Sequence, residues 1–300
     1  MKFKQLSILI AVLLVVGLAS CTKFDDPSAG KAAENIQQIK DYLTANQLQD
    51  KVQSSLSGLY YILGNTSTSQ KKATAGEELE FTYEIYYINP SGQAVLVDST
   101  NKTKSAYIPF LSGVVIPGLE EGLLLMREGQ SADFFIPSNI GFGNDTRNGK
   151  MPEYSPVIFK VKLIRSRTEA EQIDDYVQIK NLPALTTTTT GGTRVYHITK
   201  GTGATITSGE TVTVAYTANT LRGKEPFDKG DALTFKTGSS QYITGFDEGI
   251  RSLRVGDKAI LVFPSSAGYG SQGSFDQNKQ YYVVPPYTPL AFEVTVKSKQ

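Results

Sequence analysis

Alternating apolar and polar residues predict β-strands in two separate parts of the chain. Large apolar or aromatic side chains occupy every second position over residues 79–87 and again over 157–163. The same alternation returns over residues 211–218 and 290–296. Because successive side chains of a strand point to opposite faces, this pattern gives each strand one buried face. We therefore expect two sheets, each covering a core with one face.

Helical spacing accompanies both sets of strands. Residues 32–48 carry apolar side chains at Ile36, Ile39 and Leu43, which predict one narrow stripe along a helix. Two further triplets fall at i, i+4 and i+7: Leu119, Leu123 and Met126 in the first half, and Phe246, Ile250 and Leu253 in the second. An antiparallel sheet curled around one short helix belongs to the α+β class.

The chain also repeats itself. Gln38-Ile-Lys-Asp-Tyr42 recurs as Gln172-Ile-Asp-Asp-Tyr176, and Pro137-Ser138 recurs as Pro264-Ser265. Two copies of one unit, each preceded by a short helix, are the simplest account of this pattern. The expected divisions are a signal peptide over 1–20, a tether over 21–31, a first domain over 32–168 and a second domain over 169–300.

The first twenty residues predict a targeting signal. Lys2 and Lys4 precede an apolar run over 6–17, which is shorter than the roughly 20 residues of a membrane-spanning helix. Leu18-Ala-Ser-Cys21 resembles the lipobox of bacterial lipoproteins, which implies acylation of Cys21 and anchoring to a lipid bilayer. The alternative is an ordinary secretory peptide with an incidental cysteine. We expect a lipid-anchored protein of the cell envelope, at the outer membrane, facing the periplasm or the surface.

Composition excludes several classes of function. With 30 basic and 29 acidic residues, the chain has no global charge that would attract nucleic acid. Cys21 is the only cysteine, so disulfides and thiolate metal sites are excluded. His197, the only histidine, is expected to be a strand residue rather than a ligand or a base. The loop over 144–149 lacks the spaced acids of a calcium site and predicts a polar turn. We expect no metal and no cofactor.

Six short elements follow one another between residues 210 and 296. They are Val214-Ala-Tyr-Thr217, Phe227-Asp228, Gly245-Phe-Asp-Glu-Gly249, Pro264-Ser-Ser-Ala-Gly-Tyr-Gly270, Val283-Val-Pro-Pro286 and Phe292, after an acid at Glu210. This order resembles the FKBP family of peptidyl-prolyl isomerases, and a weaker copy spans 76–163. The resemblance implies two tandem FKBP-like domains, each an antiparallel sheet curled around a short helix and each preceded by a short helix.

The resemblance also implies a site in the second domain. Aromatic side chains would form the floor and walls of a pocket for a proline ring, while a backbone N–H and a tyrosine hydroxyl would hold the substrate. The implied catalytic positions are Tyr216, Asp228, Ile243, Phe246, Tyr269 and Phe292, and the implied substrate-binding positions are Phe227, Leu233, Phe235, Tyr242, Val283 and Val284. Phe246 stands where the family often has tryptophan, Tyr242 replaces a residue that is usually aliphatic, and the loop over 272–280 is lengthened.

The first domain matches the same pattern less well. Its corresponding positions are Tyr83, Asp98, Ile116, Leu119, Phe142 and Phe159. Leu119 replaces the aromatic floor and Phe142 replaces the tyrosine that would carry the hydroxyl. We therefore expect a weaker isomerase, or a peptide-binding or structural domain, in this half.

An apolar, ring-lined pocket suits the isomerisation of a prolyl bond. Rotation of the peptide bond breaks amide resonance at a barrier of about 18–20 kcal/mol. The twisted amide is less polar than the planar one, so an apolar site favours it without a covalent step. The expected function is a peptidyl-prolyl cis–trans isomerase that assists the folding of envelope proteins, with proline-containing polypeptides as substrates and activity mainly in the C-terminal domain. The alternatives are a non-catalytic chaperone or binding lipoprotein with the same fold, and a structural partner in an outer-membrane complex.

Overall fold

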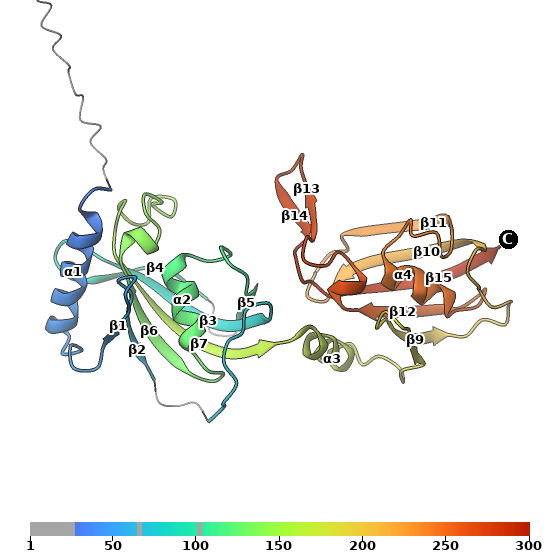
Figure 1. Ribbon diagram of the computed structural model, residues 1–300, viewed down its shortest axis with the longest axis horizontal. Coiled ribbons are helices and arrows are strands. Elements are labelled where there is room, and N and C mark those ends of the chain that lie inside the picture. Colours follow the sequence, from blue (N-terminus) through green and yellow to red (C-terminus); the bar gives the residue numbers. More distant parts are fainter. Residues whose placement is uncertain (1–27, 65–67, 101–103) are drawn as a thin grey trace, which may run out of the picture.

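The computed structural model describes residues 28–64, 68–100 and 104–300. The predicted signal peptide, the lipobox and Cys21 lie outside the described residues. Figure 1 shows two sheet-based domains, joined where strand β7 runs into helix α3. In the described part of the chain, no helix has the length and apolar character needed to cross a membrane.

The first domain is an antiparallel sheet with helices on its faces. Its strands follow the order β1-β2-β6-β7-β3-β4, and β5 also pairs with β3. Its elements are α1 (Lys31–Ala45), β1 (Gln53–Ser54), β2 (Tyr60–Leu63), β3 (Glu78–Ile88), β4 (Ala94–Ser99), β5 (Ala106–Pro109), α2 (Pro117–Leu125), β6 (Ser131–Ile136), the 3-10 turn η1 (Ser138–Ile140) and β7 (Val157–Arg167).

The second domain repeats this topology. Its strand order is β11-β10-β15-β12-β9-β8, so each strand has a counterpart at the same place in the first sheet. Its elements are α3 (Glu169–Ile179), β8 (Thr187–Thr188), β9 (Arg194–Thr199), β10 (Thr211–Thr220), β11 (Asp228–Lys236), α4 (Thr244–Arg251), β12 (Lys258–Phe263), the 3-10 turn η2 (Ser265–Ala267), β13 (Ser274–Asp276), β14 (Tyr281–Val284) and β15 (Leu290–Lys299). The α+β prediction, with one repeated unit, is therefore confirmed.

Two details differ from the expectation. The lengthened loop over 272–280 forms part of a separate hairpin of β13 and β14, which projects from the second domain. Met126 and Leu253, placed at i+7 of the two short helices, lie just beyond the helix ends at Leu125 and Arg251. Both side chains are nevertheless buried. Both helices are shorter than the apolar spacing predicted, because the segment after each helix turns back toward its sheet at these residues.

Each sheet is covered on both faces. In β6, Phe134 packs into the main core with α2, while its neighbour Phe135 contacts Ile39 and Leu43 of α1 on the opposite face. The second domain repeats this arrangement, since Ile173 of α3 packs against the outer face of its sheet. Because side chains alternate between the two faces of a strand, each sheet has a main core between it and its short helix, and a smaller core on the opposite face under its leading helix.

Each leading helix is also tied to its sheet by a polar contact. The side chain of Asn35 accepts a hydrogen bond from Ser138 N–H at 2.9 Å. At the repeated position in the second domain, the Glu169 carboxylate accepts from Ser265 N–H at 2.5 Å and from its hydroxyl at 2.6 Å. Both serines begin the 3-10 turns that follow the recurring prolines, so the repeated Pro-Ser pair has a structural role.

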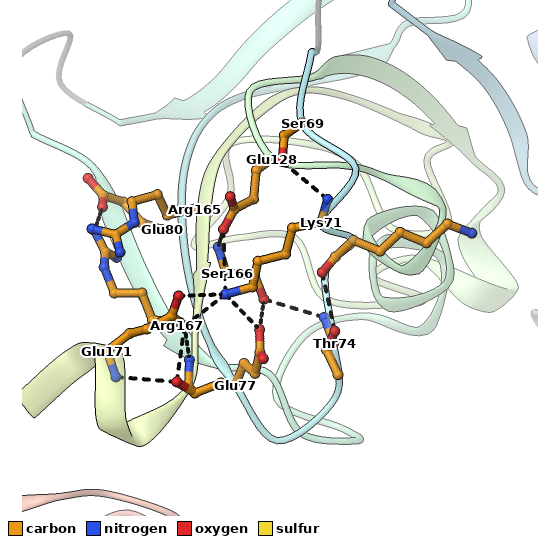
Figure 2. Close-up of polar contacts among 12 residues, drawn as sticks. Ser69, Lys71, Thr74, Glu77, Glu80, Glu128, Arg165, Ser166, Arg167 and Glu171 are labelled. Atoms are coloured by element: carbon orange, nitrogen blue, oxygen red, sulfur yellow. Dashed lines mark hydrogen bonds and ion pairs between the residues drawn. The ribbon is translucent and has the colours of Figure 1, made fainter.

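The two domains meet at a cluster of charged side chains. Figure 2 shows Lys71 of the first domain, whose Nζ lies 2.8 Å from Glu171 on α3 and 3.8–3.9 Å from Glu128 and Glu77. Ser166, at the end of β7, donates its hydroxyl to Glu77. The first turn of α3 is thereby bound to the domain that precedes it.

A second group of charges extends this junction. Arg222, after β10, makes a two-pronged contact with Glu78 of β3 at 2.6 and 2.7 Å, and its guanidinium lies 3.9 Å from the ring centroid of Tyr107. Arg167 is buried and is paired with Glu80 and, at 2.7 Å, with Asp175. A buried guanidinium is tolerated only when acids surround it, so these pairs favour one arrangement of the two domains.

Acid is expected to weaken this junction. The hydrogen bond from Lys71 lowers the pKa of Glu171 from 4.5 to about 2. A depressed carboxyl pKa contributes stability above about pH 4.5, and that contribution is lost as the pH falls toward 2. Thermal unfolding followed between pH 5 and pH 2 should therefore show a smaller pH dependence for Glu171→Gln than for the unchanged chain. Identical pH profiles for the two proteins would contradict this assignment.

Candidate functional site

Four aromatic rings of the second domain lie together between the sheet and α4. The ring of Phe246, at the start of α4, lies 5.3 Å from Phe292 on β15 and 5.8 Å from Tyr216 on β10. Tyr216 is stacked on Phe292 at 6.2 Å, and Phe235 of β11 lies 5.5 Å from Phe246. The structure thus brings the predicted floor and wall residues into one cluster.

A tyrosine–carboxylate pair lies at the edge of these rings. The Tyr216 hydroxyl donates a hydrogen bond to Asp228 Oδ2 at 2.8 Å. Burial, and then the neighbouring Asp228 carboxylate, raise the pKa of Tyr216 to about 12. Tyr216 therefore remains a neutral donor across the physiological range. The pair fixes the orientation of one wall of the site.

Two further donors at this site remain without a protein acceptor. Ile243 is the N-cap residue of α4, and its N–H makes no hydrogen bond within residues 28–64, 68–100 and 104–300. The Tyr269 hydroxyl likewise has no hydrogen-bond partner in that part of the chain, although its ring lies 6.4 Å from Phe227. Burial, and then Asp228, raise the pKa of Tyr269, so its hydroxyl keeps its proton. Both groups are available to carbonyl oxygens of a bound chain.

The first domain contains the same constellation in altered form. The Tyr83 hydroxyl donates to Asp98 at 3.1 Å, and the ring of Phe142 is stacked on Phe159 at 6.0 Å. Leu119 of α2 lies where Phe246 lies in the second domain, and Ile116 is again the N-cap residue. These residues line a cavity of about 530 Å³, apart from Asp98 behind Tyr83.

Family comparison decides what these two constellations are. The model of the FKBP-type peptidyl-prolyl cis-trans isomerase family matches residues 69–164 and 203–297, which together make up more than half of the chain. The chain belongs to the FKBP family. Each matched segment contains one of the two ring-lined sites.

Individual relatives of this FKBP chain are distant. Peptidyl-prolyl cis-trans isomerase FKBP9 of Homo sapiens is 27% identical over 178 residues, covering 58% of the chain and 28% of that protein. FKBP10 of Homo sapiens is 24% identical over 234 residues, covering 77% of the chain and 35% of that protein. The chain thus spans about a third of the length of these curated relatives.

One relative matches a shorter part of the chain, and one solved structure covers most of it at low similarity. FK506-binding protein 2 of Dictyostelium discoideum is 36% identical over 90 residues, which cover 29% of the chain and 63% of that protein. The crystal structure of the three FKBP domains of wheat FKBP73 covers 83% of the chain and 98% of its own, at 19% identity and a TM-score of 0.38. The assignment to the family therefore rests on the match of both segments to the family model.

Strand register shows which wall residues of the two FKBP sites correspond. In the first domain Phe81 faces Ala106 and Leu79 faces Ile108, whereas the second domain has Leu233 and Phe235 at the positions of Ala106 and Ile108. Tyr242, which precedes the helix N-cap, corresponds to Val115 of the first domain. Ala106, Ile108 and Val115 are each smaller than their counterparts in the second domain, and all three line the cavity of about 530 Å³ in the first domain.

Predicted rim residues of the second site lie around these rings. The Tyr242 ring packs edge-on against Phe235 at 4.8 Å and reduces the space between the walls. Leu233, Val283 and Phe227 are half-buried against the same core, and Val284 is fully buried at the base of the β13–β14 hairpin. The predicted site residues therefore come from four strands, one helix and three loops.

Three contributors to the sites were missed by the sequence analysis. Phe263 stacks on Phe292 at 5.5 Å from below the second site. Arg147 and Asp145 line the first cavity from a loop that was predicted only as a polar turn. The turn is present, but its charged side chains face the cavity. The signal available beforehand was the closeness of this loop to Phe142 in the sequence.

His197 has the structural role that was expected. It lies in β9, and its Nε2 is 3.0 Å from Asp257 and its Nδ1 is 3.0 Å from the Thr186 hydroxyl. The Asp257 carboxylate also accepts hydrogen bonds from two backbone N–H groups, those of Gly201 and Arg254. Within the described residues, no three acids, histidines or cysteines gather as a metal site would require.

Proposed function

We propose that this FKBP-family chain is a peptidyl-prolyl cis–trans isomerase whose activity resides mainly in the second domain. The observation that supports this most directly is the cluster formed by the rings of Phe246, Phe292 and Tyr216, with Asp228 hydrogen-bonded to Tyr216 at its edge. Its substrates are proline-containing segments of maturing proteins of the cell envelope. The two free donors beside the rings, Ile243 N–H and the Tyr269 hydroxyl, add what a bound backbone needs.

Mechanism follows from the polarity of this site. The planar prolyl amide is more polar than the twisted one, so a pocket lined by aromatic rings stabilises the twisted form relative to the planar form. Ile243 N–H and the Tyr269 hydroxyl hold the flanking carbonyls, and this fixes the chain on either side of the rotating bond. The Tyr216–Asp228 pair keeps one wall in place while the bond rotates. No covalent intermediate is needed.

The assay on the full chain tests this proposal. Uncatalysed isomerisation of a prolyl bond takes tens to hundreds of seconds, and the full chain should shorten this time for a chromogenic prolyl peptide. Tyr269→Phe removes one substrate hydrogen bond of about 0.5–1.5 kcal/mol, so kcat/KM should fall about two- to tenfold. Phe142→Tyr, at the matching position of the first domain, serves as the control and should leave the rate of the second site unchanged. Absence of any rate above background would refute the proposal.

The first domain supports a second function. Its cavity of about 530 Å³ is open, but it lacks the floor ring at Leu119 and the hydroxyl at Phe142. We propose that it binds apolar peptide segments and contributes little catalysis. A holding role of this kind would retain an unfolded chain near the isomerase site of the second domain.

The cellular location of the protein is a separate proposal. Leu18-Ala-Ser-Cys21 supports lipid anchoring in the cell envelope, and Cys21 is the only cysteine. Cys21→Ser is expected to move the expressed protein from the membrane pellet to the soluble fraction, which ultracentrifugation and immunoblotting would measure. Ser20→Ala, which keeps the cysteine, is the control. Equal pelleting of Cys21→Ser and the unchanged protein would contradict anchoring.

A further inference from the structure

Among the residues that the structure describes, Arg147 is the cation that lines the cavity of the first domain. The guanidinium of Arg147 lies 4.9 Å from the ring centroid of Phe142, which itself stacks on Phe159 at the wall of the cavity. Asp145 and Arg147 are the charged residues among those lining this cavity, and the remaining ones are mostly apolar. The cavity therefore combines an apolar interior with a positive group at its rim.

The loop that carries Arg147 is fixed by its own hydrogen bonds. Asp145 accepts from the N–H of Arg147 at 2.7 Å, and the Thr146 hydroxyl accepts from Gly149 N–H at 3.0 Å. The N–H of Met151 donates to the Thr146 carbonyl at 3.1 Å, and Met151 itself is buried. Because both ends of the turn are held, the guanidinium is positioned over Phe142 before any ligand arrives.

The guanidinium retains capacity for another acceptor. Its closest acid is Asp145, at 3.6 Å from Nη1, which is longer than the 2.7–2.9 Å of a charge-assisted hydrogen bond. Both side chains are well exposed, at 40% and 52%, and exposed pairs of this kind stabilise by only about 0–1 kcal/mol. Within the described residues the Arg147 side chain donates no hydrogen bond. A carboxylate from a ligand can therefore be accepted at little cost.

The loop of the second site that corresponds to this turn has no counterpart of Arg147. It continues from Tyr269 as Gly270-Ser-Gln-Gly273 and contains no basic residue. Both sites have a carboxylate paired with a tyrosine, Asp98 in the first domain and Asp228 in the second. An acidic neighbour of the bound residue therefore meets the Arg147 guanidinium at the first site and no equivalent cation in this loop of the second.

We propose that the first-domain cavity selects an apolar residue flanked by a carboxylate, with Arg147 as the specificity-determining residue. This proposal rests on the peptide-binding role proposed above for the first domain. An extended chain advances about 3.3 Å per residue, so an acid one or two positions from the residue in the cavity lies about 3–7 Å along the chain. The 4.9 Å between the Arg147 guanidinium and the Phe142 ring centroid falls within that range.

A matched pair of peptides tests this selectivity on the full chain. Both contain leucine followed by proline, and they differ only in glutamate or glutamine at the next position. Each carries a fluorescent label for anisotropy and a benzophenone group for crosslinking. The glutamate peptide should bind about fivefold more tightly, and its crosslinks should fall within residues 69–164. Raising the salt concentration should reduce the difference.

Two variants identify the cation responsible. Arg147→Gln should equalise the two affinities, whereas Lys150→Gln, which removes an exposed cation of the same loop, should preserve the difference. Circular dichroism confirms that both variants are folded. Equal affinities in the unchanged chain, or a difference that persists in Arg147→Gln, would overturn the specificity proposal alone. Absence of crosslinks within residues 69–164 for both peptides would overturn peptide binding by the first domain and the specificity with it.

Discussion

Phe246→Leu is expected to lower the prolyl-isomerase kcat/KM of the full chain about tenfold or more. Phe246 contacts Phe292 at 5.3 Å, Phe235 at 5.5 Å and Tyr216 at 5.8 Å. Leucine removes the ring from the floor of the site, and a loss of about 1.4 kcal/mol of transition-state stabilisation corresponds to a factor of ten in rate. Leucine keeps the apolar character and the helix, so the loss should appear in catalysis more than in folding. The chromogenic prolyl-peptide assay, run without a coupling protease, measures the change in kcat/KM.

The first domain supplies the matched control for this experiment. Leu119 of α2 occupies the position of Phe246, and Leu119→Met conserves both its volume and its polarity. We expect unchanged kcat/KM for this variant and unfolding midpoints close to the original for both variants. An equal loss of activity in Leu119→Met would show that the first domain carries catalysis, and full activity in Phe246→Leu would remove Phe246 from the catalytic floor.

Gly249→Val is expected to destabilise the second domain strongly. A Cβ atom at Gly249 would lie 2.5 Å from Leu261 Cδ1 and 2.9 Å from its Cδ2, and both residues are buried. Overpacking of a core costs about 1–3 kcal/mol, and valine adds a second γ-carbon to the clash. We expect a loss of about 3 kcal/mol, measured as a fall of about 10 °C in the midpoint of thermal unfolding.

A double variant distinguishes this clash from other effects of valine. Leu261→Ala removes the atoms that the new side chain would meet, although the alanine variant alone is destabilised by about 2–5 kcal/mol. The combined variant should lose less stability than the sum of the two single losses. Strict additivity would show that the close approach of α4 to β12 does not require glycine at position 249.

The two sites differ in their side chains. The second site has more rings and the free Tyr269 hydroxyl, whereas the first has a cavity of about 530 Å³ and the Arg147 cation. Salt bridges from Arg222 to Glu78 and from Lys71 to Glu171 join the domains that carry these sites. These contacts restrict the separation between the two sites.

Local patterns in the sequence were sufficient to predict the elements and their repetition. Alternation over 79–87 and 211–218 depends only on which face of a strand is buried, and the structure places β3 and β10 over these residues. The lengths of the short helices were less predictable. Met126 and Leu253 continue the apolar spacing, yet they are buried after the helix has ended, because a turn can bury a side chain as well as a helix can.

The sequence by itself determined the α+β class and the tandem repeat, because these depend on periodicity and on the order of motifs. The resemblance to the FKBP family implied most of the clustered rings, although not that of Phe263. Tertiary structure alone decided how wide each site is and which charges face it. Cavity width depends on which residues oppose one another across strands, as Ala106 and Leu233 do at matching positions. The place of Arg147 over Phe142 likewise arises from the path of a loop, which no local pattern of residues specifies.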